Sequence, residues 1–327
     1  MSNEDSLLAM DLGGTKIVTA MVSPKGEILC RENIPTLADE GVEAVIGRML
    51  ASIDSVMGKM DLSHLSPPRI AIAAAGAIDS HRGTVTDSPN LPGWCDVPLK
   101  QIVEEAFGLP TFLLNDCSAA VLGEHYFGVG RGVDNLIYVT VSTGIGGGIM
   151  IDGNLYTGVS GSAGEVGHMT IDVNGPRCNC GNDGCLEILA SGKAIAREAQ
   201  RLIAQGAKTR ILEFAEGEVD NVTAKTVAAA ALQGDALALE VISRAATYLG
   251  IGMANLVNIF NPEMIIIGGG LSKMGDMLLN PTRQVVARRA FQVAAERVRI
   301  VASELGDQNA VLGAAVFARS QSKPGRC

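Results

Sequence analysis

Four side chains that can ligate a metal through nitrogen or sulfur crowd into one short stretch of the chain: His168, Cys178, Cys180 and Cys185. One imidazole and three thiolates suit tetrahedral Zn²⁺. Gly181 and Gly184 permit the tight winding that would bring three sulfur atoms together. Because the protein would supply all four ligands, we expect a closed structural site with no position for a catalytic water. The alternative is three incidental cysteines near a histidine.

The other cysteines and histidines have no such neighbours in the sequence. The chain has seven cysteines, an odd number, and its N-terminal segment is polar and acidic, unlike a secretory signal. A disulfide framework is therefore not expected. The residues left without a chemical role are Cys30, Cys95, Cys117, Cys327, His64, His81 and His125.

A glycine turn near the N-terminus could cradle a phosphate. It reads DLGGTK from Asp11, and Gly13 and Gly14 allow successive backbone N–H groups to face one anion. Thr15 adds a hydroxyl donor, and Lys16 adds a cation if its side chain turns inward. A carboxylate beside a phosphate makes sense chiefly when Mg²⁺ lies between them, so Asp11 indicates a magnesium site.

Two further glycine clusters follow apolar strands. Residues 142–148 read STGIGGG, and Thr143 and Gly144 could form a second phosphate cradle. The cluster at 268–270 could let a flat adenine ring approach the backbone at Gly269. Each turn by itself is equally an ordinary glycine turn, but two cradles at equivalent places in a repeated pattern favour phosphate binding. The sequence contains neither a P-loop nor a GxGxxG dinucleotide motif.

Three carboxylates are candidates for work on a substrate that carries hydroxyl groups. Asp116 follows Asn115 at the end of an apolar strand, where α/β proteins place their chemistry. A carboxylate there can take the proton of a hydroxyl that attacks phosphorus, although a helix N-cap is the alternative role. Glu165 and Glu187 lie on either side of the cysteine run. They could bind a polyol, or could be a solvent-facing acid and a helix N-terminal charge.

These residues need a scaffold in which strands alternate with helices. Apolar runs joined by glycine turns predict two hairpins, 7–12 with 17–22 and 136–142 with 146–151, so the same unit occurs twice. Apolar residues spaced by three and four predict a helix from Val42 to Met57. This alternation calls for mainly parallel sheets covered by helices, an α/β fold. The other expected elements are strands at 69–75, 111–114, 264–267 and 297–302, and helices at 97–107, 118–127, 235–260, 273–295 and 308–319.

Composition indicates a globular protein of about two domains. The chain has 327 residues, of which 47% are apolar and 19% charged, enough to bury sizeable cores. With 26 Lys and Arg against 35 Asp and Glu, the net charge of −9 argues against a general nucleic-acid or anionic-membrane surface. No apolar run approaches the roughly 18–20 residues needed to cross a bilayer. We therefore expect a soluble, cytoplasmic protein.

Six motifs together resemble the ROK family of sugar kinases and sugar-responsive repressors, within the hexokinase–actin-like ATPase superfamily. They are DLGGTK at 11–16, SPNLPGW at 88–94, Asn115-Asp116, STGIGGG at 142–148, AGEVGH at 163–168 and CNCGNDGCLE at 178–187. The resemblance spans essentially the whole chain and implies duplicated ribonuclease H-like domains with mixed sheets and a cleft between them. We expect an N-terminal domain of residues 1–121, completed by a C-terminal helix at 308–327, and a larger domain of residues 122–307 that carries the zinc loop.

The resemblance also implies roles for single residues, with Asp116 as the catalytic base. The residues that would bind sugar hydroxyls are Asn90, Asn115, Asp116, Glu165, His168 and Glu187. His168 would also bind zinc through its other ring nitrogen. Those that would lie along the ATP phosphates and Mg²⁺ are Asp11, Gly14, Thr15, Thr143 and Gly144, beside Gly13, Lys16 and Gly269 from the turns themselves.

The function expected is ATP-dependent phosphorylation of the 6-hydroxyl of a hexose, with glucose as the first choice, by a homodimer or homotetramer. N-acetylmannosamine or another hexose or hexosamine is the alternative substrate. A sugar-sensing repressor is the rival class, but such repressors carry a helix-turn-helix before the kinase-like fold, whereas DLGGTK begins here at Asp11. The positions that depart from the family's usual pattern are 73–77 (AAAGA), Cys117-Ser118 and Val141-Ser142. The first of these could alter which sugar fits.

Overall fold

The structure is a computed structural model that describes residues 7–59 and 69–321. His64, Cys327 and the polar N-terminal segment lie outside the described residues. The chain divides into two compact units: unit 1 comprises Met1–Asp134, Gly148–Gly164 and Glu304–Cys327, and unit 2 comprises Asn135–Gly147 and Glu165–Ser303. The domain limits expected from the sequence stay a prediction.

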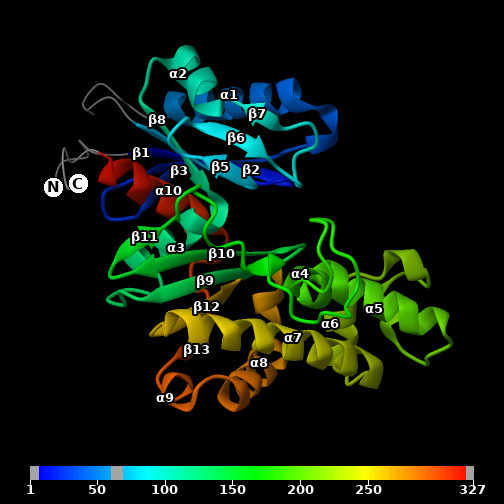
Figure 1. The fold of residues 1–327 in the computed structure, drawn as a ribbon. Helices are drawn as coiled ribbons and strands as arrows, with labels where there is room; N and C mark the ends of the chain where they lie inside the picture. Colours follow the sequence, from blue (N-terminus) through cyan, green and yellow to red (C-terminus); the bar gives the residue numbers. More distant parts are fainter. Residues whose placement is uncertain (1–6, 60–68, 322–327) are drawn as a thin grey trace. The chain divides into compact units, whose positions relative to one another are not determined.

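Unit 1 contains a five-stranded mixed sheet in the order β3-β2-β1-β4-β8 (Figure 1). Its strands are β1 (Leu7–Leu12), β2 (Lys16–Val22), β3 (Ile28–Pro35), β4 (Ile70–Ala74) and β8 (Thr111–Asn115). The first three strands pair antiparallel, whereas β4 and β8 run parallel to β1. The carboxyl ends of β1, β4 and β8 therefore meet at one edge, which brings the residues that follow them together.

A small antiparallel sheet in unit 1 was not expected from the sequence. It consists of β5 (Ala77–Asp79), β6 (Thr84–Asp87) and β7 (Cys95–Val97), in that order. Strands of three or four residues are too short for a readable alternation of apolar and polar side chains. This sheet supports the segment 88–94, which connects β6 to β7 and carries Asn90.

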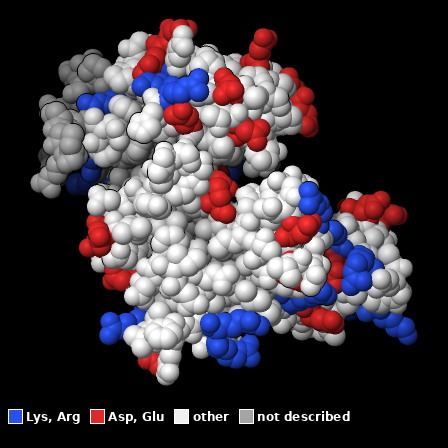
Figure 2. All heavy atoms as spheres, viewed as in Figure 1, with Lys and Arg blue, Asp and Glu red and all other residues white. Residues whose placement is uncertain are grey.

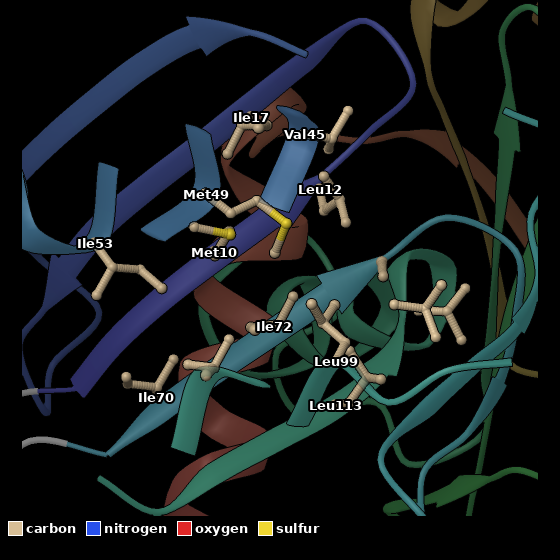
Figure 3. Close-up of a cluster of buried hydrophobic side chains, with 14 of the residues drawn as sticks. Met10, Leu12, Ile17, Val45, Met49, Ile53, Ile70, Ile72, Leu99 and Leu113 are labelled. Atoms are coloured by element: carbon tan, nitrogen blue, oxygen red, sulfur yellow. The ribbon is translucent and has the colours of Figure 1, made fainter. Parts of the chain in front are cut away.

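The helices of unit 1 are α1 (Val42–Gly58), α2 (Leu99–Phe107), α3 (Asp116–Phe127) and α10 (Asn309–Ser320), with short helical turns η2 (Ala38–Glu40) and η8 (Gly306–Gln308). The expected apolar stripe of α1 is confirmed, since Val45, Met49 and Ile53 are fully buried against Met10 and Ile17 of the sheet (Figure 3). The expected C-terminal helix is confirmed as α10, which packs on α3 and β1.

Helices α3 and α10 approach closely because two glycines face the partner backbone. A Cβ on Gly313 would collide with the carbonyl of Ala119, and a Cβ on Gly123 would collide with the carbonyl of Asn309. Such contacts tolerate no larger residue without moving a helix. The pair ties the C-terminal segment of the chain to the helix that begins at Asp116.

The second sheet runs in the order β11-β10-β9-β12-β13, and the boundary between the two units falls within β10. Its strands are β9 (Leu136–Val141), β10 (Ile145–Ile151), β11 (Asn154–Tyr156), β12 (Met264–Gly268) and β13 (Arg299–Ala302). Strands β9, β12 and β13 are parallel to one another. The residues after β9 and β12 consequently lie at the same edge of the sheet.

The remaining helices of unit 2 are α4 (Leu186–Ala190), α5 (Gly192–Ala204), α6 (Ala224–Leu232), α7 (Ala236–Phe260), α8 (Asp276–Arg289) and α9 (Gln292–Ala295). The helical turns are η4 (Val166–His168), η5 (Ile211–Phe214), η6 (Val219–Asn221) and η7 (Gly270–Met274). The long helix expected at 235–260 is confirmed as α7, and the segment expected at 273–295 forms α8 and α9, joined to the end of η7.

Helix α7 alters one expectation from composition. By length and apolar content alone it is able to cross a bilayer, although no such run was anticipated from the sequence. Half of its most apolar window is buried within the protein, and it packs against α4, α5, α6 and α8. This is the pattern of a core helix. On the face drawn in Figure 2, Lys and Arg side chains are interspersed with Asp and Glu.

Candidate active site

The first glycine turn, between β1 and β2, is fixed from both sides. The Gly13 N–H donates to the Lys16 carbonyl at 3.1 Å, and the Thr36 hydroxyl donates to the Gly13 carbonyl at 2.6 Å. On the other side, a Cβ added to Gly14 would lie 2.6 Å from the carbonyl oxygen of Asn90. The turn expected to hold phosphate therefore lies directly against the loop expected to hold sugar.

Asp11, the penultimate residue of β1, is held in an environment that disfavours its charge. Burial, and next the carboxylate of Asp116, raise the pKa of Asp11 to about 7, while Lys16 acts in the opposite direction. The two carboxylates thus lie near one another at the sheet edge of unit 1, as the parallel strands require. A divalent cation would relieve their repulsion and stabilise the ionised form of Asp11, so the residues fit the expected Mg²⁺.

Lys16 does not turn into the phosphate turn in this structure. Its ammonium bonds the Asp307 carboxylate at 2.8 Å, and both side chains are partly exposed. Asp307 lies in η8, which leads into α10, and is 291 residues from Lys16 in the chain. No local signal in the sequence could have found this pair. The expected contact between Lys16 and phosphate stays a prediction.

The sequence left two roles open for Asp116, a helix N-cap and a general base, and in the structure its neighbour Asn115 takes the first. Asn115 is the N-cap of α3, because its side-chain oxygen accepts from the N–H groups of Cys117 and Ser118, and its amide nitrogen donates to the Gly76 carbonyl at 3.1 Å. Asp116 is the first residue of the helix and accepts from the Cys117 N–H at 2.8 Å. The cap is thus supplied by Asn115, and the half-buried Asp116 is placed at the carboxyl end of β8.

The Asn90 loop is anchored on both sides of its exposed asparagine. The Ser88 hydroxyl donates to the Ala75 carbonyl at 2.8 Å, and Leu91 and Trp94 are buried in the core of unit 1. The departure from the usual family sequence at 73–77 lies beside this anchor, since Gly76 packs against Asp87 and Ser88 with a φ of 112°. A change there can shift the Asn90 loop.

The second glycine turn, between β9 and β10, is held by hydrogen bonds from residues of unit 2. The Ser142 N–H donates to the Gly144 carbonyl at 2.9 Å, and the N–H of Gly192, the first residue of α5, donates to the Ser142 carbonyl at 2.7 Å. Thr143 is exposed at the tip. The Ile145 N–H donates to Glu187 Oε2 at 2.9 Å, a contact that the sequence gave no reason to expect.

The third glycine cluster lies beside the second turn. Gly268 pairs with Thr140 across the parallel strands β12 and β9. Gly269 has a φ of 77°, and a Cβ on it would lie 2.6 Å from the Val141 carbonyl. The structure therefore brings Gly269 next to the segment that holds Thr143 and Gly144. An adenine contact at Gly269 stays a prediction.

The expected metal ligands converge. The ligand atoms of His168, Cys178, Cys180 and Cys185 all lie within 4.8 Å of one another. His168 Nδ1 is 3.9 Å from Cys178 Sγ, and the sulfur atoms of Cys180 and Cys185 are 3.6 Å apart. A hydrogen bond from the Asn182 backbone lowers the pKa of Cys180 to about 7, whereas burial raises the pKa of Cys185 to about 12. This donor set fits Zn²⁺, whose charge would hold all three sulfurs as thiolates.

Glu165, His168 and Glu187 form one cluster in unit 2. His168 Nε2 lies 3.9 Å from Glu165 Oε2, on the side of the ring opposite the metal ligands. Burial raises the pKa of Glu165; His168 lowers it and the Glu187 carboxylate raises it further. The structure thus brings these three together in unit 2. In unit 1 it brings Asp11 near Asp116 and the Asn90 loop against the first glycine turn.

Comparison with known proteins decides the family. A sequence model described as the ROK family matches residues 7–321. The chain belongs to the ROK family. It is 39% identical over 309 residues to a glucokinase of Thermotoga maritima, covering 94% of this chain and 96% of the relative. It is 38% identical to a putative xylose repressor of Caldicellulosiruptor, covering 95% of this chain and 77% of that protein.

Solved structures of ROK proteins share the fold. A ROK glucokinase from Streptomyces griseus, in complex with glucose and AMPPNP, has a TM-score of 0.85 and 34% identity, and covers 96% of this chain and 99% of that one. A ROK transcriptional regulator, a homolog of the E. coli MLC protein, has a TM-score of 0.86 and 31% identity, and covers 97% and 78%. The expected α/β fold with mixed sheets of the actin-like ATPase type is confirmed.

Proposed function

We propose that this ROK protein is an ATP-dependent glucose kinase that phosphorylates the sugar's 6-hydroxyl. The proposal rests on one observation above all: Asp11 and Asp116 lie close together where parallel strands end, and Asp11 opens the glycine turn. Its similarity along nearly the full length of glucokinases supports the same conclusion, as does the likeness to a relative that binds glucose and AMPPNP.

In this mechanism Asp116 is the general base. Its carboxylate takes the proton of the 6-hydroxyl while that oxygen bonds to the γ-phosphorus of ATP; the bond from the γ-phosphorus to the bridging oxygen breaks, and ADP leaves. Asn115 caps α3 and thereby fixes the orientation of Asp116. The first and second glycine turns hold phosphates, and Gly269 admits the adenine ring. Asp11 would hold Mg²⁺, which neutralises phosphate charge when bound.

The sugar ligands in this proposal are Asn90, Asn115, Asp116, Glu165, His168 and Glu187. Neighbouring hydroxyls of a hexose can donate paired hydrogen bonds to one carboxylate, and a buried polar group left unpaired by a wrong sugar costs about 1–3 kcal/mol. The zinc ligands would be His168, Cys178, Cys180 and Cys185, whose ligand atoms lie within 4.8 Å of one another. A metal held there would fix the His168 ring and leave its other nitrogen for the sugar. Zinc here is structural, because four protein ligands close the site.

The test is ADP release with glucose, N-acetylmannosamine, N-acetylglucosamine and fructose, for the wild type and Asp116→Asn. Glucose should give the highest kcat/KM, and the variant should lose on the order of 10²–10⁴ in kcat. If none of the four sugars supports ADP release, or if Asp116→Asn is fully active, the proposed kinase function is refuted. Preference for N-acetylmannosamine would keep the enzyme class and change the substrate.

A sugar-sensing repressor is the second candidate, because xylose repressors match this chain at 36–38% identity. An electrophoretic shift with promoter DNA, released by a sugar, would favour that function over catalysis.

We further propose a cytoplasmic homodimer or homotetramer, which the resemblance to the ROK family supports. Sedimentation of the purified protein tests the assembly, and cell fractionation tests the location.

A further inference from the structure

Glu187 contacts a part of the protein that its expected role as a sugar ligand does not explain. It lies in the first turn of α4, two residues after Cys185. Its Oε2 accepts the backbone N–H of Ile145 at 2.9 Å. A Cβ on Gly144 would collide with the same oxygen. The carboxylate is therefore packed directly onto the second glycine turn.

This contact joins two clusters that the proposed function assigns to different substrates. On one side is the turn with Thr143 and Gly144, expected along the phosphates of ATP. On the other side are Glu165 and His168, expected on the sugar: α4, which carries Glu187, packs on η4, whose N-cap is Glu165 and whose last residue is His168. All five residues belong to unit 2. One carboxylate thus lies between the nucleotide turn and the sugar cluster.

The chemistry allows both contacts at once. A carboxylate has two oxygens with about four lone-pair directions, so one oxygen can keep the Ile145 N–H while the group also accepts from a hydroxyl. A charged acceptor on a backbone N–H is a strong hydrogen bond and restricts the peptide it holds. The glycine at 144 provides the space for this approach, and its conformation does not itself require glycine, since its φ is not positive.

We propose that Glu187 is a positioning residue for the second glycine turn, and that it links sugar binding to the geometry of the phosphate site. The proposal rests on the proposed function for the identity of the two substrates. It explains why the turn is anchored by a side chain that follows the candidate metal ligands, in addition to the backbone hydrogen bond from Gly192. Removing this anchor changes nucleotide binding even when no sugar is present.

The decisive measurement is the affinity for AMPPNP with Mg²⁺ in the absence of sugar, by calorimetry on the full chain. Glu187→Gln loses the charge but keeps a side-chain oxygen for the Ile145 N–H, whereas Glu187→Ala loses both. Comparing these two neutral variants cancels the effect of removing a negative charge near phosphate. We expect Glu187→Ala to bind AMPPNP about 10-fold more weakly than Glu187→Gln, the effect of losing one neutral hydrogen bond. Equal affinities, or tighter binding by Glu187→Ala, would overturn the proposal.

Glu165 offers a matched control in the same cluster. Glu165→Ala and Glu165→Gln should have the same sugar-free affinity for AMPPNP, because the contact of Glu165 is with His168. A difference of about 10-fold in AMPPNP affinity between these two variants would mean that any truncation in the cluster disturbs the turn. That result would contradict a specific role for Glu187.

Gly144→Ala tests the contact from its other side and serves if Glu187→Ala does not fold. Its methyl group displaces the Glu187 carboxylate, so sugar-free AMPPNP binding should weaken about 10-fold in this variant alone, and in its background Glu187→Ala and Glu187→Gln should bind AMPPNP equally. Wild-type affinity in Gly144→Ala, or a gap of about 10-fold between its two double variants, would contradict the proposal.

The wild-type sugar panel separates this inference from the proposed function. If no sugar is phosphorylated but Glu187→Ala and Glu187→Gln differ in AMPPNP affinity, the kinase assignment fails and the positioning role stands. If glucose is phosphorylated and the two variants bind AMPPNP equally, the kinase stands and the positioning role fails.

Discussion

Gly14→Ala tests whether the first glycine turn must lie against the Asn90 loop. The added Cβ would lie 2.6 Å from the Asn90 carbonyl oxygen, whereas ordinary contact begins at 3.4 Å, so the turn or the loop must move by the difference, about 0.8 Å. The carbonyl is backbone, and no rotamer change can absorb the overlap. Misplacing reacting groups by about 1 Å costs on the order of 10²-fold. We therefore expect kcat/KM for glucose to fall by about 30–100-fold.

The assay measures ADP release with coupling enzymes. Glucose is varied at saturating MgATP, and MgATP is varied at saturating glucose. Gly13→Ala is the matched control, since its Cβ would lie 3.3 Å from the Lys16 carbonyl; neither glycine has a positive φ, so both tolerate alanine conformationally. Gly13→Ala should lower kcat/KM for glucose by less than about fivefold. Gly47→Ala on α1, with nothing within 4 Å, should keep wild-type activity. Wild-type activity in Gly14→Ala, or equal losses in both turn variants, would refute the reasoning.

Three further outcomes concern stability and the metal. Burial acts to raise the pKa of Asp235, but hydrogen bonds from Arg210, Ala238 and Thr209 hold this pKa below the ordinary value of an aspartate. Its stabilisation is therefore complete above the unfolded pKa and is lost as pH falls through the folded pKa. Asp235→Asn should lower Tm by several degrees at pH 7 in circular dichroism melts, and a Tm gap that does not narrow as pH falls below the ordinary Asp range would contradict this. Gly313→Ala should cost about 1–3 kcal/mol in urea unfolding, and no loss would mean that α3 and α10 separate freely. Elemental analysis should find about one zinc per chain, and its removal by chelator should lower Tm, whereas a metal-free protein of equal stability and activity would exclude the zinc site.

Local patterns in the sequence were enough wherever the chemistry is local. The convergence of the candidate metal ligands could be predicted because the three cysteines and two glycines of this loop lie within a few residues, and those glycines set the winding. The stripe on α1 is readable because helical spacing places Val45, Met49 and Ile53 on one face. The short strands β5 to β7 carry no such periodicity, so they were missed.

The sequence by itself determined the hairpins with their glycine turns, the long helices and the four side chains that converge as candidate metal ligands, because each depends on neighbours along the chain. Only the tertiary structure decided that Asn115 supplies the helix cap, that Lys16 pairs with Asp307, and that Glu187 holds the turn at Ile145. The last two pairs are separated by 291 and 42 residues. Contacts of this kind arise when parallel strands and packed helices bring distant segments to one edge, and no spacing in the sequence encodes them.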